Sequence, residues 1–287
     1  MQSEVRAELA AATAELAAAG LGSARVEAEL LLAHVLDLDR GRLPGRRSVS
    51  PAETARFRQL VGRRATRLPL QHLTGTAPFR HLDLAVGPGV FIPRPETELL
   101  VELAARWLVP GATVLDLCAG SGAIALSVAK EFPVGRVIAV ESSPSALAWL
   151  RRNAANRQAA GDRPIEVVAG DIAAAGLLTE LDGTVAVVLA NPPYVPESIR
   201  AELPPEVVHD PDEALFAGAD GLALMPALIG LSARLLRSGG FLGIEHDESQ
   251  PASMHRLLTG SGQWETVTGR PDLTGRPRFS TAVRGER

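Results

Sequence analysis

The stretch of sequence that decides the fold is Thr113-Val114-Leu115-Asp116-Leu117-Cys118-Ala119-Gly120-Ser121-Gly122-Ala123-Ile124-Ala125. Its first part has the apolar character of a buried strand, and a loop with two glycines follows before helical character begins near Ser121. Glycine lets the backbone approach a ligand closely, and the start of a helix points free N–H groups at it. The pattern predicts a strand, a ligand-binding turn and a helix; a tight turn without a ligand is the structural alternative.

The rest of the chain after Gly111 continues this alternation of apolar strands and helical stretches. We expect strands at residues 113–117, 136–140, 165–168, 185–190 and 240–244. This order is typical of a doubly wound α/β fold with a parallel sheet. Two more expected strands, 264–267 and 278–283, are joined by a connection too short for a crossover helix, so we expect them to pair antiparallel at one edge.

Acidic residues end the second and third of these strands, at the edge where ligands of open sheets bind. Glu141 can accept hydrogen bonds from both hydroxyls of a ribose, in NAD or in an adenosyl cofactor, or it can cap the helix that begins near Ser143. Asp171 is placed to meet the amino group of an adenine, with Ile172 against the ring, or to cap a helix that runs to Leu178. The glycine loop fits either cofactor, because its spacing also matches the dinucleotide pattern.

The motif that separates these cofactors is Asn191-Pro192-Pro193-Tyr194, which follows the very apolar strand 185–190. The prolines keep the backbone out of a helix and leave carbonyl groups without internal donors. The Asn191 side-chain oxygen and the Pro192 carbonyl can each accept one hydrogen of a planar amide or amine nitrogen, while Tyr194 stacks on its plane. This arrangement aims the nitrogen lone pair at a sulfonium methyl, which predicts a methyltransferase that uses S-adenosylmethionine; a plain proline turn is the alternative.

The part of the chain before Gly111 has a different pattern. Up to about residue 67 the apolar residues recur at helical spacing, and Ser50-Pro51-Ala52-Glu53 predicts the start of one of these helices. Residues 79–92 alternate around Gly87-Pro88-Gly89, which predicts a β-hairpin that bridges two domains. The run Pro93-Arg94-Pro95-Glu96-Thr97-Glu98 then holds the backbone extended before a helix that begins near Thr97.

The composition is that of a globular protein with a catalytic domain and a smaller one. The 287 residues are 46% hydrophobic and 22% charged, and no apolar run reaches the ~18 residues that span a bilayer. The N-terminus lacks the pattern of a targeting signal and Cys118 is the single cysteine, so we expect a cytoplasmic protein that contacts no membrane. The histidines are scattered without metal-ligand spacing, so we expect neither a metal nor covalent catalysis.

The net charge of -4 conceals a basic stretch between Arg40 and Arg67. It holds nine arginines, and the acidic residues that oppose them are Glu53 within the stretch and Asp39 directly before it. Such a face could meet an anionic partner, but in a chain whose only lysine is Lys130 it is equally typical of a solvated helical surface. The acidic balance of the whole chain argues against direct binding of nucleic acid.

Taken together, these segments resemble the PrmC/HemK family, the peptide chain release factor glutamine methyltransferases, and the resemblance runs nearly end to end. The similar segments are residues 28–36, 69–75, 91–98, the glycine loop, 191–194 and 214–222. The run from Pro93 to Glu98 is the most family-specific of them. Small departures occur at Cys118 and Ala119, at Glu141 where aspartate is common, and at Ile172 where an aromatic residue can stand, but no required group is lost.

The resemblance implies a seven-stranded, Rossmann-like class I S-adenosylmethionine-dependent methyltransferase domain, mostly parallel with an antiparallel edge. It implies a release-factor-binding helical bundle at residues 1–77, a hairpin and proline-rich linker at 78–98, and the methyltransferase domain at 99–287. The implied reaction methylates the side-chain amide nitrogen (N5) of the glutamine in the Gly-Gly-Gln loop of class I release factors, which supports translation termination and leaves S-adenosylhomocysteine. We expect the enzyme to be a monomer.

The resemblance also assigns the site residues by position. Those implied to bind the cofactor are Asp116, Cys118, Ala119, Gly120, Ser121, Gly122, Glu141, Asp171, Ile172 and Asn191. Those implied to bind the substrate glutamine are Asn191, Pro192, Pro193, Tyr194 and Arg94. Catalysis is implied to rest on Asn191, Pro192 and Tyr194.

Other functions remain open on the sequence alone. An adenine-N6 nucleic-acid methyltransferase could use the same tetrapeptide on a flipped base, but the chain after Gly111 has no insertion large enough for base recognition. A glutamine methyltransferase of a ribosomal protein is closer in chemistry, and the run from Pro93 to Thr97 argues against it. An NAD oxidoreductase leaves Asn191 to Tyr194 unexplained, and a non-catalytic module that grips a release factor would be expected to lose Asn191 or the glycines.

Overall fold

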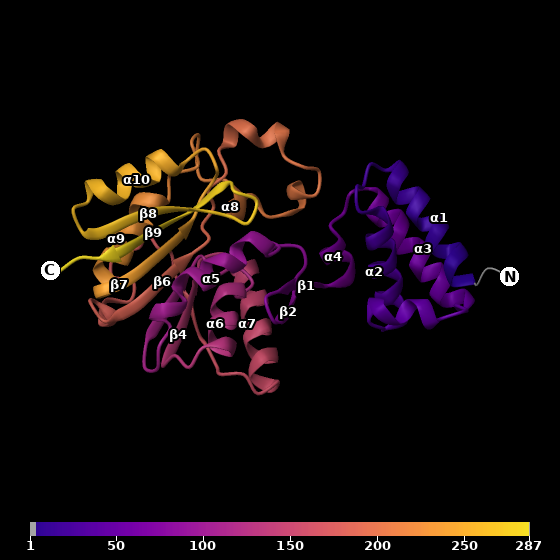
Figure 1. The fold of residues 1–287 in the computed structure, drawn as a ribbon, viewed down its shortest axis with the longest axis horizontal. Coiled ribbons are helices and arrows are strands. Elements are labelled where there is room, and N and C mark those ends of the chain that lie inside the picture. The colour runs from indigo at the N-terminus through magenta and orange to yellow at the C-terminus, as the bar shows by residue number, and fades with distance from the viewer. Residues whose placement is uncertain (1–3, 287) are drawn as a thin grey trace. The chain divides into compact units, whose positions relative to one another are not determined.

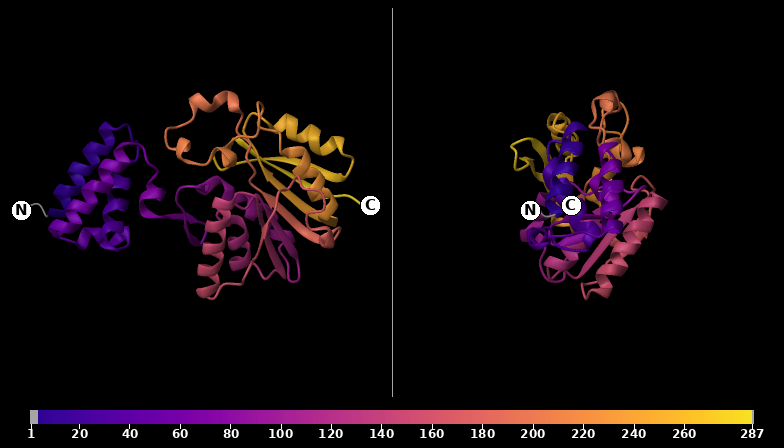
Figure 2. Two further views of the ribbon diagram at one scale, coloured as in Figure 1. Left: turned by 180° about the vertical axis from the view of Figure 1, so that it is seen from behind. Right: turned by 90° about the vertical axis from the view of Figure 1, so that its right-hand side faces the viewer.

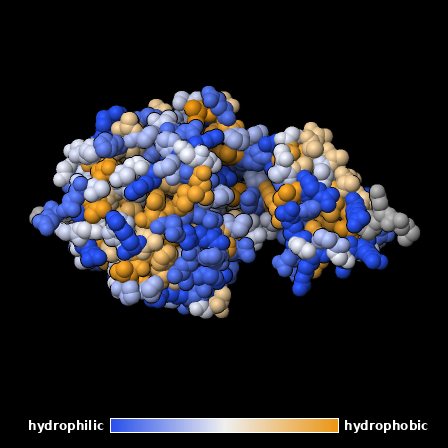
Figure 3. Space-filling view, viewed as in Figure 1, coloured by the Kyte–Doolittle hydropathy of each residue, from blue (hydrophilic) through white to orange (hydrophobic). Residues whose placement is uncertain are grey.

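The computed structural model describes residues 4–286, which form two compact units. The helical unit contains the described residues up to Thr76 together with Pro204–His209, and the sheet unit contains Ala77–Leu203 and the described residues from Asp210 onward. Residues 78–98, the predicted linker, therefore belong to the sheet unit. Hydrophilic and apolar side chains are interspersed on the visible faces of both units (Figure 3). No helix within residues 4–286 is long and apolar enough to cross a membrane.

The helical unit is a set of short helices around one apolar core (Figure 1). They are α1 (Glu4–Ala18), α2 (Ala24–Leu36), the 3-10 helix η1 (Arg40–Gly45), α3 (Pro51–Ala65) and α4 (Leu70–Thr74). The predicted start of α3 is confirmed. The Ser50 hydroxyl accepts a hydrogen bond from the Glu53 N–H, and the Glu53 carboxylate accepts one from the Ser50 N–H, which is the reciprocal capping that fixes a helix start.

Much of the basic stretch is paired with carboxylates inside the helical unit. Three arginines lie on its surface in ion pairs: Arg40 with Glu29, Arg46 with Glu53, and Arg58 with Glu8. This pairing favours the solvated-surface interpretation of the arginines, because exposed pairs of this kind neutralise charge while contributing little to stability.

A buried ion cluster ties α3 to α2 and to the segment Pro204–His209 of the same unit. Arg64, which is 4% exposed, pairs with Glu27 and also with Glu206, at 2.9 Å from the second carboxylate. Arg67 contacts Glu206 at 2.8 Å. Burial acts to raise the pKa of Glu206, but hydrogen bonds from Arg67 and Arg64 outweigh it and lower that pKa to about 2.

We expect Glu206→Gln to destabilise the protein at neutral pH and to lose this effect in acid. The pKa of the folded carboxylate lies below its ordinary value of 4.5, so its contribution is present above that pH and is lost as the pH falls toward about 2. The measurement is the difference in urea midpoint between wild type and variant over this range, with Glu202→Gln as the control at an exposed carboxylate. A difference that stays constant down to low pH would contradict the assignment.

The sheet unit contains a seven-stranded sheet in the order β5-β4-β3-β6-β7-β9-β8 (Figure 1). Its strands are β3 (Thr113–Leu117), β4 (Arg136–Glu141), β5 (Glu166–Ala169), β6 (Val185–Ala190), β7 (Leu236–Glu245), β8 (Trp264–Pro271) and β9 (Pro277–Arg284). The strands β3 to β7 pair in parallel, and β9 runs antiparallel to both β7 and β8. The predicted doubly wound sheet with an antiparallel edge is confirmed.

Helices cover both faces of this sheet (Figures 1 and 2). The α-helices of the sheet unit are α5 (Glu98–Ala104), α6 (Ala123–Glu131), α7 (Pro144–Ala159), α8 (Asp212–Leu215), α9 (Met225–Leu235) and α10 (Pro251–Gly260). Its 3-10 helices are η2 (Pro95–Thr97), η3 (Ala105–Trp107), η4 (Thr179–Leu181) and η5 (Glu197–Glu202), whereas η6 (Val207–His209) belongs to the helical unit. The apolar residues of α5, α6 and α7 pack on one face, and those of α9 and α10 pack on the other. Every residue of β6 is buried, and β6 is the middle strand of the sheet. The residues that follow it therefore begin at the centre of the sheet edge.

Two local expectations are wrong. The hairpin consists of β1 (Thr76–Phe79) and β2 (Leu82–Ala85), and it turns at Arg80 rather than at Gly87-Pro88-Gly89. Arg80 adopts a φ of 50° and is held there because its N–H donates to Glu98 at 2.8 Å while its guanidinium pairs with Glu131. The alternative in which Asp171 caps a helix also fails, because residues 172–178 form turns and a bend.

Candidate active site

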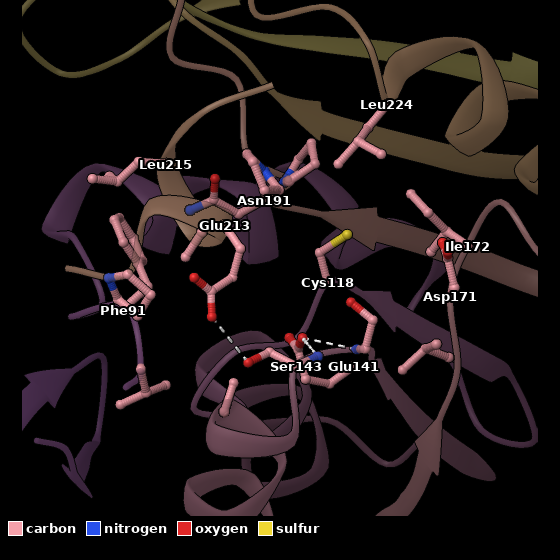
Figure 4. A pocket seen from close by; sticks show the side chains of 18 of the residues that line it. Phe91, Cys118, Glu141, Ser143, Asp171, Ile172, Asn191, Glu213, Leu215 and Leu224 are labelled. Atoms are coloured by element: carbon pink, nitrogen blue, oxygen red, sulfur yellow. Dashed lines mark hydrogen bonds between the residues drawn. The ribbon is translucent and has the colours of Figure 1, made fainter. Parts of the chain in front are cut away.

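The sheet unit holds a cavity of about 410 Å³ where β3, β4, β5 and β6 end (Figure 4). A volume of this size falls within the range of small-molecule sites. The predicted site residues that line it are Cys118, Glu141, Asp171, Ile172, Asn191, Pro192, Pro193 and Tyr194. The parallel strand order therefore brings the predicted cofactor and substrate residues to one cavity.

The glycine loop leaves β3 in left-handed backbone conformations. Cys118 has a φ of 62°, and Gly120 and Gly122 follow at 55° and 87°. A Cβ at Gly122 would lie 2.6 Å from Leu150 Cδ1, so this position requires glycine for both its conformation and its space. Cys118 is the residue of the loop that lines the cavity, and the predicted Ala119, Gly120, Ser121 and Gly122 are not among the lining residues.

Asp116 lies beneath the loop and does not line the cavity either. Its Oδ2 accepts a 3.0 Å hydrogen bond from the Ala125 N–H at the start of α6, while its buried Oδ1 has no partner among residues 4–286. Burial raises the pKa of Asp116 to about 8. The side chain joins β3 to α6 and leaves its second carboxyl oxygen without a partner.

Glu141 ends β4, and its carboxylate bonds the backbone of the glycine loop and the backbone that leads into α7. Its Oε2 accepts from the Gly120 N–H, and its Oε1 accepts from the Ser142 and Ser143 N–H groups, each at 2.8 Å. The bond to Ser143 reaches the residue just before α7 and no N–H of the helix itself, so Glu141 does not cap α7. Since a carboxylate offers roughly four acceptor positions, Glu141 still has capacity for a hydroxyl donor in the cavity.

Asp171 and Ile172 form the wall that follows β5 (Figure 4). The Asp171 Oδ1 accepts a 2.8 Å hydrogen bond from the Ala173 N–H, which fixes the local turn. Ile172 is buried and packs with the core that underlies α9, and Leu224 lines the cavity on the same side in Figure 4. This wall is apolar except for one exposed carboxylate.

The tetrapeptide Asn191 to Tyr194 emerges from β6 with its two side chains anchored and its acceptors free. The Asn191 Nδ2 donates to the Thr97 hydroxyl at 3.1 Å, and the Tyr194 hydroxyl donates to the Glu245 carboxylate at 2.8 Å. No group within residues 4–286 donates to the Asn191 Oδ1 or to the Pro192 carbonyl. Two unengaged oxygens and an aromatic ring thus stand at the wall of the cavity.

A second loop fixes the backbone of this tetrapeptide. The Gln250 Nε2 donates to the carbonyl oxygens of Tyr194 and Asp220, each at 2.9 Å. Gly221 packs so closely that a Cβ there would lie 2.0 Å from the Tyr194 carbonyl oxygen. These contacts join Gly221 and Asp220 to the backbone of the tetrapeptide.

Arg94, a predicted substrate residue, is placed away from the cavity wall. Its guanidinium lies 2.5 Å from the buried Asp210 carboxylate and 4.9 Å from the centre of the Phe91 ring. Asp210 also accepts a hydrogen bond from the Ile92 N–H. Arg94 therefore supports the backbone around Phe91, which does line the cavity.

Sequence reasoning missed other lining residues, among them Phe91, Ser143, Glu213 and Leu215. Figure 4 shows Glu213 reaching toward Ser143, whose hydroxyl lies 3.4 Å from its carboxylate. Phe91 and Leu215 were within reach of the sequence, because both belong to segments that carry the family resemblance. Glu213 stands outside those segments and has no signal of its own.

The strand order and a cavity at the ends of β3 to β6 define a class I S-adenosylmethionine-dependent methyltransferase. Two solved structures share the fold. One is the hMettl16 catalytic domain in complex with the MAT2A 3′UTR hairpin 6, with a TM-score of 0.57 and 16% identity over 79% of this chain and 81% of that one. The other is a methyltransferase from Pyrococcus furiosus, with a TM-score of 0.54 and 17% identity over 78% of this chain and 99% of that one. Residues 88–221 match the family described as methyltransferase small domain, and residues 8–75 match the PrmC N-terminal domain.

Curated relatives narrow this class to one family. The release factor glutamine methyltransferase of Mycolicibacterium smegmatis is 52% identical over 282 residues, covering 98% of each chain. Those of Streptomyces coelicolor and Mycobacterium tuberculosis H37Rv are 45% and 44% identical, covering 96% and 95% of this chain and 96% and 89% of theirs. The chain belongs to the release factor glutamine methyltransferase family, and it is an enzyme that uses S-adenosylmethionine. The predicted family is confirmed.

Proposed function

We propose that this protein transfers the methyl group of S-adenosylmethionine to the side-chain amide nitrogen of the glutamine in the Gly-Gly-Gln motif of class I release factors. The observation that carries the proposal is the pair of unengaged acceptors, Asn191 Oδ1 and the Pro192 carbonyl, beside the anchored ring of Tyr194. A primary amide has two N–H groups and a planar π-face. Each N–H group can therefore bond one of the two acceptors, while the π-face stacks on the ring of Tyr194.

The residues around the cavity fit the cofactor. Glu141 has one acceptor position left, enough for one ribose hydroxyl, and the wall of Ile172 and Leu224 suits an adenine face. The buried Oδ1 of Asp116 has no partner among residues 4–286, and we assign it to the cofactor's ammonium although Asp116 does not line the cavity itself. When bound, S-adenosylmethionine supplies a methyl group made electrophilic by its sulfonium.

The residues of the chain account for the nitrogen's reactivity without a strong base. Asn191 Oδ1 and the Pro192 carbonyl accept the two amide hydrogens and turn the nitrogen lone pair toward the methyl. With the cofactor bound, the N–C bond would form as the C–S bond breaks, and one of the two amide hydrogens would leave the nitrogen as a proton to water. The two hydrogen bonds strengthen as positive charge develops on the nitrogen, so they stabilise the transition state more than the ground state. Tyr194 is no base: burial, the nearby Glu245 and the hydrogen bond to it raise the pKa of the hydroxyl well above its ordinary value.

We expect Glu141→Gln to weaken cofactor binding by roughly 10- to 100-fold, because a hydrogen bond to a charged acceptor contributes about 1.5–3 kcal/mol. Glu141→Asp keeps the charge and should weaken binding less. The measurement is isothermal titration of each variant with S-adenosylmethionine, with circular dichroism to confirm that the fold persists. Equal affinities for the wild type and the Gln variant would remove Glu141 from the proposed ribose site.

The methyl acceptor is tested by supplying labelled S-adenosylmethionine with either a purified bacterial class I release factor or duplex DNA that contains adenine. We expect label only in the release factor, and none in a factor whose Gly-Gly-Gln glutamine is replaced by alanine. Label in DNA instead would favour the adenine-N6 alternative.

We also infer a role for the helical unit in binding the partner. The helical unit, which matches the PrmC N-terminal domain over residues 8–75, would contact the release factor outside its glutamine loop. All residues that line the cavity come from one sheet unit, which is compatible with a monomer. Because release factors act during translation, the enzyme would work in the cytoplasm.

A further inference from the structure

In the family-specific run from Pro93 to Glu98, the side chain of Thr97 bonds to the tetrapeptide Asn191 to Tyr194, which is proposed to bind the substrate. Its hydroxyl accepts the 3.1 Å hydrogen bond from Asn191 Nδ2 and donates at 2.7 Å to Glu245 Oε2. The other carboxylate oxygen, Oε1, accepts the 2.8 Å hydrogen bond from the Tyr194 hydroxyl. The Glu245 carboxylate at the end of β7 thus holds Tyr194 directly and Asn191 through Thr97.

We propose that Thr97 and Glu245 are positioning residues that fix which end of the Asn191 amide faces the substrate. An asparagine amide can rotate by half a turn and exchange its oxygen for its NH₂ group with almost no change of shape. The oxygen accepts a substrate N–H, whereas the NH₂ group would oppose it. The enzyme therefore needs a device that selects one orientation.

The direction of the hydrogen bonds supplies that device. A carboxylate only accepts, so Glu245 takes the single hydroxyl hydrogen of Thr97 and leaves the Thr97 oxygen as an acceptor. That oxygen can bond the Asn191 NH₂ group but not the Asn191 oxygen. Thr97 is 3% exposed and Glu245 is fully buried, so water cannot take over either role, and the Asn191 oxygen is left for the cavity.

Thr97 donates to Glu245 only while Glu245 is ionised, so the selection of the Asn191 orientation depends on the charge of Glu245. The groups around Glu245 determine the pH at which that charge is lost. Burial raises the pKa of Glu245 to about 7, against the lowering effect of Thr97, Tyr194 and Arg278, while Glu96 adds to the rise. A protonated Glu245 could donate to Thr97 and reverse the chain of hydrogen bonds. The same geometry then favours the unproductive orientation of Asn191.

The inference rests on the proposed role of Asn191, and a double-mutant cycle tests it separately from that role. Thr97→Val keeps the shape but removes both hydrogen bonds, and we expect it to lower kcat roughly 10- to 100-fold, the effect of a lost buried hydrogen bond. Thr97→Ser should recover most of this loss. In an Asn191→Ala background, Thr97→Val should cost less than about threefold, because the group that it orients is gone.

The assay is single-turnover methylation of a release factor, with the affinity for S-adenosylmethionine measured for every variant. The pH dependence of kcat adds a second readout: a fall below about pH 7 in the wild type should flatten in Glu245→Gln, which cannot titrate. Wild-type kcat in Thr97→Val, or losses that simply multiply in the double variant, would overturn the inference. A wild type that binds cofactor but methylates no release factor would instead defeat the proposed function.

Discussion

Asn191→Ala lowers kcat by roughly 10²- to 10³-fold in the proposed mechanism, the range found when one preorganised transition-state contact is removed. The substitution deletes the oxygen that accepts a substrate N–H, and nothing within residues 4–286 otherwise bonds that oxygen. Because the interaction strengthens only as charge develops on the nitrogen, KM should change much less than kcat. Single-turnover kinetics with a release factor measure the effect.

The affinity for S-adenosylmethionine is the control for this variant. We expect it to stay within about tenfold of the wild type, since Glu141 and the glycine loop are untouched. A large loss of cofactor affinity with unchanged single-turnover rate at saturating cofactor would show that Asn191 binds cofactor and does not act on the substrate.

Gly221→Ala has an effect of similar size through a steric route. The added Cβ would stand 2.0 Å from the Tyr194 carbonyl oxygen and 2.6 Å from the Gln250 Nε2. The tetrapeptide must move by an ångström or more to relieve this clash, and a displacement of about 1 Å at a reacting group costs roughly 10²-fold in rate. We expect at least that loss of kcat, with a protein that still binds S-adenosylmethionine.

Gly218→Ala is the matched control, because it lies in the same loop and has the same backbone constraint. Its φ is 80°, against 73° for Gly221, but its Cβ would meet only Ala223, at an ordinary 3.5 Å. Both variants carry about 1 kcal/mol of left-handed backbone strain, so strain alone lowers both melting temperatures. Equal activity in the two variants would show that the contact with Tyr194 is unimportant.

The parts of the site that are local in sequence could be predicted. The residues from Thr113 to Ala125 form a strand, a turn and a helix because apolar character, glycine and small helical residues follow one another directly. Asn191 to Tyr194 were recognisable for the same reason: a polar residue and two prolines at the end of a fully apolar strand leave few structures open.

The contacts between distant segments could not be predicted. Thr97 meets Asn191, and Glu245 meets both Thr97 and Tyr194, yet nothing near Glu245 in the sequence distinguishes it from an ordinary acidic residue after a strand. Within the run from Pro93 to Glu98 the resemblance assigned Arg94 to the substrate, whereas in the structure Arg94 pairs with Asp210. The hairpin turn was predicted in the wrong place for a similar reason. The turn at Arg80 is held by Glu98 of α5 and Glu131 of α6, which are distant in the sequence.

The most direct test of the central claim is tandem mass spectrometry of a bacterial class I release factor after incubation with this protein and S-adenosylmethionine. We expect one added methyl group, located by fragmentation on the side chain of the Gly-Gly-Gln glutamine. The Asn191→Ala variant should add no methyl group in the same time. An unmodified glutamine in a reaction where cofactor binding is demonstrated, or a methyl group located on another residue, would contradict the claim.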